Sequence, residues 1–300
     1  MWFIFTVCTI LAWSGSDLFS KLGSRPDDRN SHLKLVMSVG LVMGIHAAWQ
    51  IFIDKVDYDP KSWLIYLPVS LLYILSMTFG YIGLRYLELS VSSPVCNSSG
   101  ALTALLCFAF LGQRMSAGQF AAVALICAGV LTLGILEKRR SDAERRKAGE
   151  TSEKKYTVGL VALSFPIIYC VLDALGTFAD AYYLEYRLDE TSANISYELT
   201  FAIAALLCLV YVVFVKREKL TLARDGYKLA GAVFETAGQF AYVFALSGNA
   251  IVAAPAIASY SVFSVLWSRL FLKEKLPKSY YIAIALVLAG IIVLGVFEEA

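Results

Sequence analysis

Apolar runs of roughly 20 residues alternate along the chain with short segments that hold nearly all of its charge. A helix of about 20 apolar residues crosses the bilayer core of about 30 Å, and runs of this length are typical of helices rather than strands. The pattern predicts an all-α membrane protein with ten transmembrane helices, at 2–22, 33–53, 62–88, 92–111, 117–136, 156–184, 193–216, 229–248, 251–272 and 278–297.

One stretch of the chain occurs twice. Residues 94–134 align without a gap to residues 255–295, at an offset of 161 residues, with 12 identities in 41 positions. Each copy holds two apolar segments joined by a short polar hinge, and internal similarity at a fixed offset indicates a duplicated structural unit. The ten helices therefore form two sets of five, and because five is odd, the two sets insert in opposite senses as inverted repeats.

The most charged stretch divides these two repeats. The sequence predicts a first five-helix repeat over 1–137, a solvated linker over 138–155 and a second repeat over 156–300. Lys and Arg are unevenly placed, with twenty in the loops after odd-numbered helices and four in the other loops. Since basic residues are enriched in cytoplasmic loops, we expect the linker in the cytoplasm and both termini outside, in a plasma or inner cell membrane.

Composition agrees with a membrane protein and excludes several other classes. The chain is 58% hydrophobic and 17% charged, with a mean hydropathy of +0.65, whereas soluble domains are about 45–50% apolar and about 25% charged. The six cysteines lie in apolar runs without a C-x-x-C motif, and only two histidines are present, so we expect no disulfide, metal or other cofactor. The net charge of +2 gives no reason to expect a nucleic-acid partner. The first apolar run lacks a preceding basic segment and is interpreted as a membrane helix rather than a signal peptide.

The ionisable residues at membrane depth are nearly all acidic, and no Lys or Arg lies near a helix centre. Such groups cost about 2.5–3.5 kcal/mol each to insert, so they usually face a cavity or a partner. These carboxylates must be protonated, paired with a histidine or matched by a cation, which disfavours nucleotide-sugar and phosphate-ester ligands. The group comprises Asp17, His46, Asp173, Asp180, Glu198 and Glu235.

Two aromatic–carboxylate pairs share the same spacing. Trp13 and Asp17 are four residues apart, on one face of a helix, and Tyr169 and Asp173 repeat this arrangement 156 residues later. The two halves are therefore expected to present the pair symmetrically. Aromatic rings contribute about 0.5–2 kcal/mol each to binding of a cation, so this arrangement favours an organic cation.

Further candidates come from helical spacing and from the repeat. Glu235, Gln239 and Tyr242 lie on one helix face, and Tyr242 aligns with Tyr81 at the 161-residue offset. The prolines that begin each copy are expected to bend their helices and to expose polar groups one turn later. The predicted ligand site comprises Trp13, Asp17, Tyr81, Asn97, Ser98, Tyr169, Asp173, Glu235, Gln239, Tyr242 and Tyr260, with proton coupling assigned to Asp173, Glu235 and His46.

Structural roles remain open for several of these groups. Asp17 is also placed to pair with Lys21, four residues on. Asp180 lies near the outer end of its helix and is interpreted as interfacial rather than buried. Glu198 is close to the outer surface, where a structural or gating role is expected, and His46 is alternatively a hydrogen-bonded packing residue.

The repeated helix pair resembles the repeated module of the drug/metabolite transporter superfamily, EamA type. Supporting matches are the segment Leu11-Ala12-Trp13-Ser14 with Lys21, and Gly83-Leu84-Arg85-Tyr86-Leu87 leading into Ser93-Pro94. The family often has Glu in the hinge between the paired helices, which Glu274 keeps and Gln113 does not. The resemblance implies ten helices, a cavity between the halves and alternating-access transport of small metabolites, amino acids, amines or drugs.

The expected function is secondary active transport of a small organic cation, amine or amino-acid-like metabolite, with proton coupling as a hypothesis. An alternative is a carrier of neutral or aromatic solutes in which the carboxylates are structural. An intramembrane enzyme is a remote alternative, because the sequence has neither H-E-x-x-H nor G-x-S-x-G, and we expect no enzyme activity. The expected partners are a small-molecule substrate, cation or zwitterion, and the lipid bilayer, for a monomer or homodimer.

Overall fold

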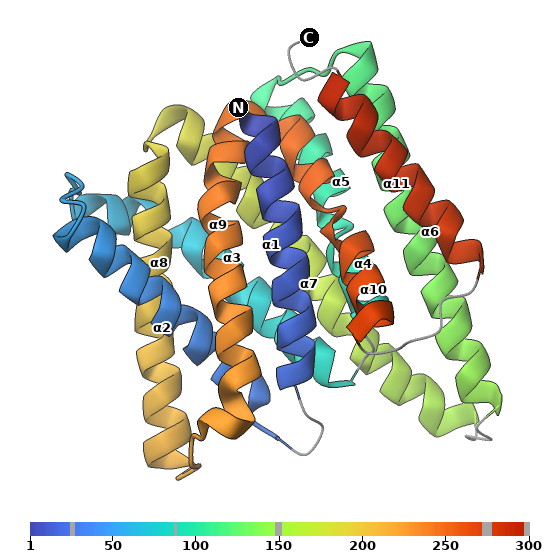
Figure 1. Cartoon of the computed structure of the whole chain (residues 1–300), viewed down its shortest axis with the longest axis horizontal. Helices are drawn as coiled ribbons and strands as arrows, with labels where there is room; N and C mark the ends of the chain where they lie inside the picture. The colour runs from blue at the N-terminus through green and yellow to red at the C-terminus, as the bar shows by residue number, and fades with distance from the viewer. Residues whose placement is uncertain (25–27, 87–88, 148–151, 272–277, 297–300) are drawn as a thin grey trace.

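The chain folds into a bundle of helices (Figure 1). The computed structural model describes residues 1–24, 28–86, 89–147, 152–271 and 278–296, and every regular element within these ranges is helical. Helices satisfy their own backbone hydrogen bonds, which apolar surroundings require. The elements are α1 (Trp2–Gly23), α2 (Ser31–Phe52), α3 (Lys61–Tyr86), α4 (Leu89–Cys96), α5 (Ser99–Leu106), the π-helix η1 (Cys107–Leu111), α6 (Ala117–Lys147), α7 (Ser152–Tyr186), α8 (Glu190–Leu209), the π-helix η2 (Val210–Val215), α9 (Leu222–Ile257), α10 (Tyr260–Phe271) and α11 (Lys278–Val296).

Seven of the described helices are long and apolar enough to cross a membrane by length and composition. They correspond to the predicted helices at 2–22, 33–53, 62–88, 117–136, 156–184, 193–216 and 229–248. The other three predicted segments are shorter or interrupted: 92–111 is divided among α4, α5 and η1, 251–272 is divided between α9 and α10, and 278–297 corresponds to the 19 residues of α11.

Two helix breaks lie at equivalent positions of the sequence repeat. Between α4 and α5 the Ser98 amide donates to the carbonyl of Val95 (3.3 Å), and between α9 and α10 the Ser259 amide donates to that of Ala256 (3.0 Å). These bonds span three residues, so the backbone tightens locally and the helix axis is interrupted. Each break comes one turn after a proline, Pro94 or Pro255, which agrees in position with the predicted bends.

The predicted boundary between 248 and 251 coincides with a kink at Asn249 (φ −166°, ψ 79°), which divides α9 into two helical parts. At the charged connection, the predicted helices 117–136 and 156–184 were too short. The predicted linker over 138–155 is helical up to Lys147 and again from Ser152. The stretch is rich in Ala, Glu, Arg and Lys, which are strong helix formers, so the two adjoining helices continue through the charged region.

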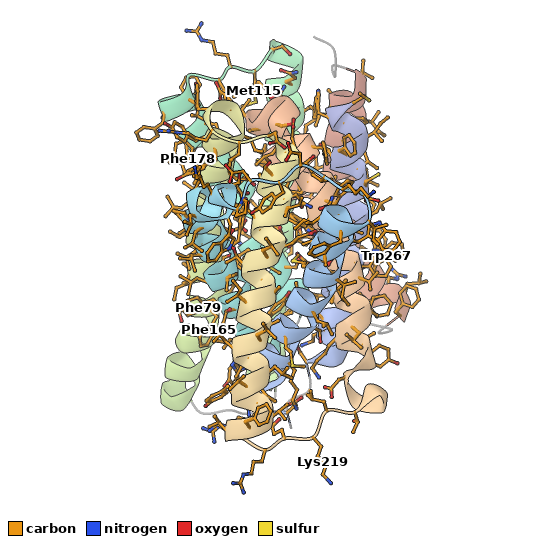
Figure 2. All side chains as sticks on the ribbon, turned by 90° about the vertical axis from the view of Figure 1, so that its left-hand side faces the viewer. Phe79, Met115, Phe165, Phe178, Lys219 and Trp267 are labelled. Carbon is orange, nitrogen blue, oxygen red and sulfur yellow. The ribbon has the colours of Figure 1, made fainter. Side chains whose placement is uncertain are left out.

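The long helices pack in pairs, α1 against α9, α2 against α8, α3 against α7 and α6 against α11. The bundle has two ends (Figure 1). The terminal face is the end where α1 begins and where α11 ends. The linker face is the opposite end, where α6 ends and α7 begins. Met115 lies toward the terminal face and Lys219 at the linker face (Figure 2).

The contact between α6 and α11 is reciprocal. A Cβ atom added to Gly129 would lie 2.9 Å from the carbonyl oxygen of Ala283, and one added to Gly290 would lie 2.9 Å from that of Ala122. Both glycines and both alanines are related by the same offset of 161 residues. The two helices therefore exchange equivalent positions across their contact, and glycine is required at each for the backbones to approach.

Candidate functional site

A cavity opens among α1, α3, α4, α7, α8, α9 and α10. Its empty volume, including its open mouth, is about 680 Å³, within the range of about 300–1,000 Å³ that is usual for small-molecule sites. The C-terminal halves of α1 and α3 and the N-terminal half of α9 contribute most of its wall. Because all three of these segments lie on the linker side, the cavity occupies the half of the bundle nearer to the linker face.

Three carboxylates line this cavity, Asp17 of α1, Asp173 of α7 and Glu235 of α9. Its described lining includes no Lys, Arg or His. The site is therefore acidic and apolar, as predicted for these three residues. Charge of one sign in low-dielectric surroundings is costly unless a counter-charge or a proton compensates it.

Serine hydroxyls hold the two aspartates. Asp17 Oδ2 accepts hydrogen bonds from Ser93 Oγ (2.7 Å) and Ser264 Oγ (2.8 Å), and Asp173 Oδ2 accepts one from Ser99 Oγ (2.7 Å). These serines lie on α4, α10 and α5, so the two broken helices position both carboxylates. Lys21, the alternative partner considered for Asp17, donates to the carbonyl of Leu84 (3.0 Å).

Aromatic rings form much of the remaining wall. Trp13 lies 4.9 Å from the ring of Tyr242 and 5.7 Å from that of Tyr260, measured between ring centroids. Trp13 packs against Gly238 of α9, and its counterpart Tyr169 packs against Gly80 of α3. Each aromatic ring of the predicted pair thus rests on a glycine of a helix from the other half of the sequence.

Several buried donors in the cavity wall are left without a partner. Within the described part of the chain, Trp13 Nε1, the Tyr81 hydroxyl and Gln239 Nε2 make no hydrogen bond. All three residues line the cavity. A buried polar group without a partner costs about 1–3 kcal/mol, so these groups are available to a ligand or to water.

Some predicted site residues lie elsewhere. Tyr242 and Asn97 line a smaller neighbouring cavity nearer the terminal face, together with Trp13, Tyr169, Asp173 and Tyr260. Ser98 lies instead beside a small pocket bordered by Cys127 and Val130 of α6, outside the main cavity. The next residue, Ser99, donates to Asp173.

His46 also lies outside the main cavity. Its Nδ1 lies 2.7 Å from Glu198 Oε1, in the contact between α2 and α8, and Asn194 Nδ2 donates to the same oxygen (3.2 Å). The Glu198 side chain is fully buried, whereas that of His46 is 34% exposed. The structure therefore places His46 in a separate polar pair, where it does not contact the cavity carboxylates.

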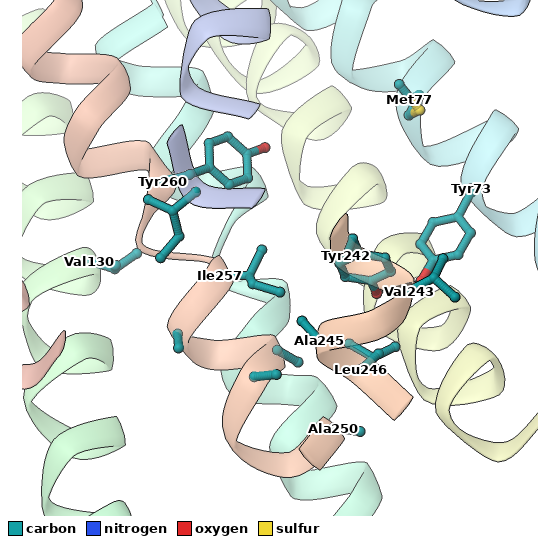
Figure 3. Packing of buried hydrophobic residues seen from close by; sticks show 14 of the residues in the cluster. Tyr73, Met77, Val130, Tyr242, Val243, Ala245, Leu246, Ala250, Ile257 and Tyr260 are labelled. Carbon is teal, nitrogen blue, oxygen red and sulfur yellow. Dashed lines mark hydrogen bonds between the residues drawn. The ribbon is translucent and has the colours of Figure 1, made fainter. Parts of the chain in front are cut away.

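A buried network connects three helices between the cavity and the terminal face. Asp180 accepts hydrogen bonds from Tyr66 (2.6 Å) and Tyr73 (3.3 Å), and Tyr73 and Tyr242 share a hydrogen bond of 2.7 Å between their hydroxyls. Tyr242 also donates to Thr177 (3.0 Å). Figure 3 shows Tyr73 and Tyr242 side by side in the packed core. The interfacial position expected for Asp180 was wrong, because two tyrosine hydroxyls satisfy this carboxylate in the interior.

A second polar cluster lies at the linker face. Lys34 pairs with Asp28 (3.1 Å) and Glu218 (2.7 Å), and Lys228 pairs with Asp225 (2.7 Å) and Asp28 (3.5 Å). Both lysine side chains are buried. The cluster joins the start of α2, the start of α9 and the segments before them, on the side of the bundle toward which the cavity lies.

Comparison with known proteins identifies the family of this chain. The sequence profile of the EamA-like transporter family matches residues 1–135 and 160–296. The chain belongs to the EamA-like transporter family. It is thereby a member of the drug/metabolite transporter superfamily, and a family of membrane transporters agrees with the seven membrane-length helices.

Solved structures agree in fold with this EamA-like chain. One crystal structure superposes with a TM-score of 0.68, covering 100% of this chain and 99% of the other, at 17% sequence identity. At this identity the likeness shows the fold alone. No curated protein sequence matches the chain.

Proposed function

We propose that this protein is a secondary active transporter that moves a small organic cation, amine or amino-acid-like metabolite across a cell membrane by alternating access. The observation that supports the ligand class is the cavity, in which Asp17, Asp173 and Glu235 meet aromatic rings without a basic residue in the described lining. A cationic ligand would compensate the buried negative charge and contact the faces of the rings, at about 0.5–2 kcal/mol per ring.

The protein is further proposed to consist of two inverted five-helix repeats, 1–137 and 156–300, joined at 138–155. The reciprocal contact between α6 and α11 supports this symmetry, as do the equivalent helix breaks. In this arrangement three further segments each cross the membrane once: α4–α5–η1, the part of α9 after Asn249 together with α10, and α11. With the seven long helices, this makes ten membrane crossings. Broken helices at mid-membrane are tolerated where they line a cavity.

Alternating access requires one side of the cavity to close while the other opens. The cavity lies toward the linker face, and the hydrogen-bond network of Asp180, Tyr66, Tyr73, Tyr242 and Thr177 lies between it and the terminal face. We take this network as the closed gate of the present state. The excess of Lys and Arg in the linker-side loops supports a cytoplasmic linker face and extracytoplasmic termini.

Proton coupling is proposed for the cavity carboxylates. Asp173 or Glu235 would hold a proton in one half of the cycle and the cationic substrate in the other. His46 is proposed to take part in proton coupling through Glu198, because the two side chains are in direct contact. Asp173→Asn or Glu235→Gln should abolish proton-driven transport, and unchanged transport in both variants would reject the coupling.

A neutral or zwitterionic solute is the second candidate. The unpartnered Trp13 Nε1, Tyr81 hydroxyl and Gln239 Nε2 would bind acceptor groups such as a carboxylate or carbonyl. In this case the serine-bound aspartates would serve mainly to hold the broken helices.

A thermal-shift screen of the purified protein separates the two candidates. Organic cations, amino acids and neutral aromatics would be compared on the wild type and on Asp173→Asn. A ligand at a hundredfold excess over its Kd adds about 2.7 kcal/mol to stability. A shift with cations that disappears in the variant supports the cation site. A shift confined to neutral or zwitterionic compounds, and retained in the variant, supports the second candidate.

A further inference from the structure

Within the proposed function, on which this inference rests, we propose that the substrate carries two cationic nitrogens, one held by Asp17 and one by Asp173. The proposal narrows the ligand from any organic cation to a diamine or a comparable dication. It follows from the equivalent placement of the two carboxylates in one cavity.

The two aspartates occupy matching positions in the two halves. They are related by an offset of 156 residues, each four residues after an aromatic residue, Trp13 or Tyr169. All four residues line the same cavity, and each ring packs against a glycine across the bundle. The cavity thus offers two similar subsites, each made of one carboxylate and one aromatic ring, from opposite halves of the chain.

Hydrogen bonding prepares both carboxylates to bind a cationic group. Asp17 Oδ2 accepts two serine hydroxyls, from Ser93 and Ser264, whereas Asp173 accepts one from Ser99 on Oδ2 and a second hydroxyl from Tyr169. A hydroxyl that donates to a carboxylate stabilises the ionised form. A monocation would compensate only one of the two charges, and leaving the other buried and uncompensated is costly.

The third carboxylate differs from this pair. Glu235 stands one turn before Gln239 on α9 and has Ser16 of α1 as its hydrogen-bond partner. The residue at its repeat-related position, 161 earlier, is Ile74, which has no charge. Glu235 therefore lies outside the symmetric pair, and we assign the two cationic groups to the aspartates alone, with Glu235 holding a proton while the substrate is bound.

The test compares ligands that differ in a single charge. Binding of α,ω-diaminoalkanes, n-alkylamines of matched length and amino acids to the purified full chain would be measured by calorimetry. Close charge pairs contribute about 1.5 kcal/mol or more, which predicts binding of the best diamine about tenfold or more tighter than its matched monoamine. Equal affinity of the two on the wild-type protein would overturn the proposal without any variant.

Variants then locate the two charges. Asp17→Asn and Asp173→Asn should each remove the preference for the diamine, while the exposed control Asp57→Asn should keep it. Retention of the preference in either aspartate variant contradicts the assignment. If monoamines bind as tightly as diamines, only this inference is rejected. If no cation binds, both this inference and the proposed cationic substrate are rejected.

Discussion

At the scale of single residues, the sequence located the cavity carboxylates because their position is unusual by itself. An acidic side chain in the middle of an apolar helix has few explanations, and Asp17, Asp173 and Glu235 all line the cavity. The serines that hold the aspartates carry no such signal, since single serines are common in membrane helices. Only the folded chain brings Ser93 and Ser264 to Asp17.

Tyr73 and Met77 were missed although a signal was present. Both line the cavity together with Tyr81, and the three residues are spaced by four along α3. This spacing places them on one helix face. The buried cluster around Lys34 and Lys228 was not predictable in the same way, because a basic residue at a helix start normally faces water, and its partners here come from distant segments.

The close approach of Trp13 to α9 gives a prediction for one glycine. A Cβ atom at Gly238 would lie 2.6 Å from Trp13 Nε1, so Gly238→Ala should displace the indole from the cavity wall. We expect a loss of about 0.5–2 kcal/mol in ligand binding, the contribution of one cation–π contact. Gly226→Ala is the control, since no atom lies within 4 Å of its added Cβ. Equal affinity of the two variants would show that Trp13 does not contact the ligand.

The linker-face cluster gives a prediction for pH. The hydrogen bond from Lys34 holds the pKa of Glu218 below its ordinary value, and partial burial opposes this only in part. A lowered pKa in the folded state contributes stability above the unfolded pKa of about 4.3, and this contribution is lost as the pH falls through the folded value.

Glu218→Gln should therefore have a lower Tm than the wild type at pH 7, and the difference should shrink below about pH 4.3. Thermal unfolding in detergent across this range measures the effect, with the exposed Asp57→Asn as a control that is expected to follow the wild type. A difference in Tm that stays constant from pH 7 to below pH 4 would contradict the account.

At the scale of elements, the repeat predicted where helices would be disturbed but not how far. Pro94 and Pro255 indicated bends, and the structure separates α4 from α5 and α9 from α10 one turn later. The polar Ser-Gly-Asn segment at 247–249 predicted a break between two helices, and the structure has a kink there, at Asn249. The two helical parts share the label α9, which packs along α1.

The tyrosine network of α3, α7 and α9 yields a prediction about gating. Tyr242 makes two hydrogen bonds in it, whereas the repeat-related Tyr81 has none within the described chain and faces the cavity. Tyr242→Phe removes contacts of about 1 kcal/mol each and should favour opening at the terminal face. Tyr81→Phe, the matched control, should not.

Accessibility of Cys96, which lines the cavity, measures this opening. In a version that keeps Cys96 as its single cysteine, a hydrophilic thiol reagent applied from the terminal face should label Tyr242→Phe faster than the wild type or Tyr81→Phe. Equal labelling of the two tyrosine variants would exclude the network as the gate on that side.

At the scale of the whole molecule, apolar run lengths predicted an all-helical membrane protein, and this is confirmed together with the family. The ends of the helices were less predictable, since hydropathy does not distinguish a polar loop from a helix that continues into water. The charged ends of α6 and α7 are the example. The arrangement of the halves rests on contacts such as Gly129 with α11, which no local pattern encodes.

The central claim is that the acidic, aromatic cavity carries a cationic substrate. Counterflow in proteoliposomes tests it most directly, with vesicles preloaded with an unlabelled amine and uptake of the labelled compound measured for the wild type, Asp173→Asn and Asp57→Asn. The account predicts saturable uptake by the wild type and Asp57→Asn, and its loss in Asp173→Asn. Uptake that is unaffected by Asp173→Asn, or no uptake of any amine by the wild type while neutral solutes exchange, would contradict it.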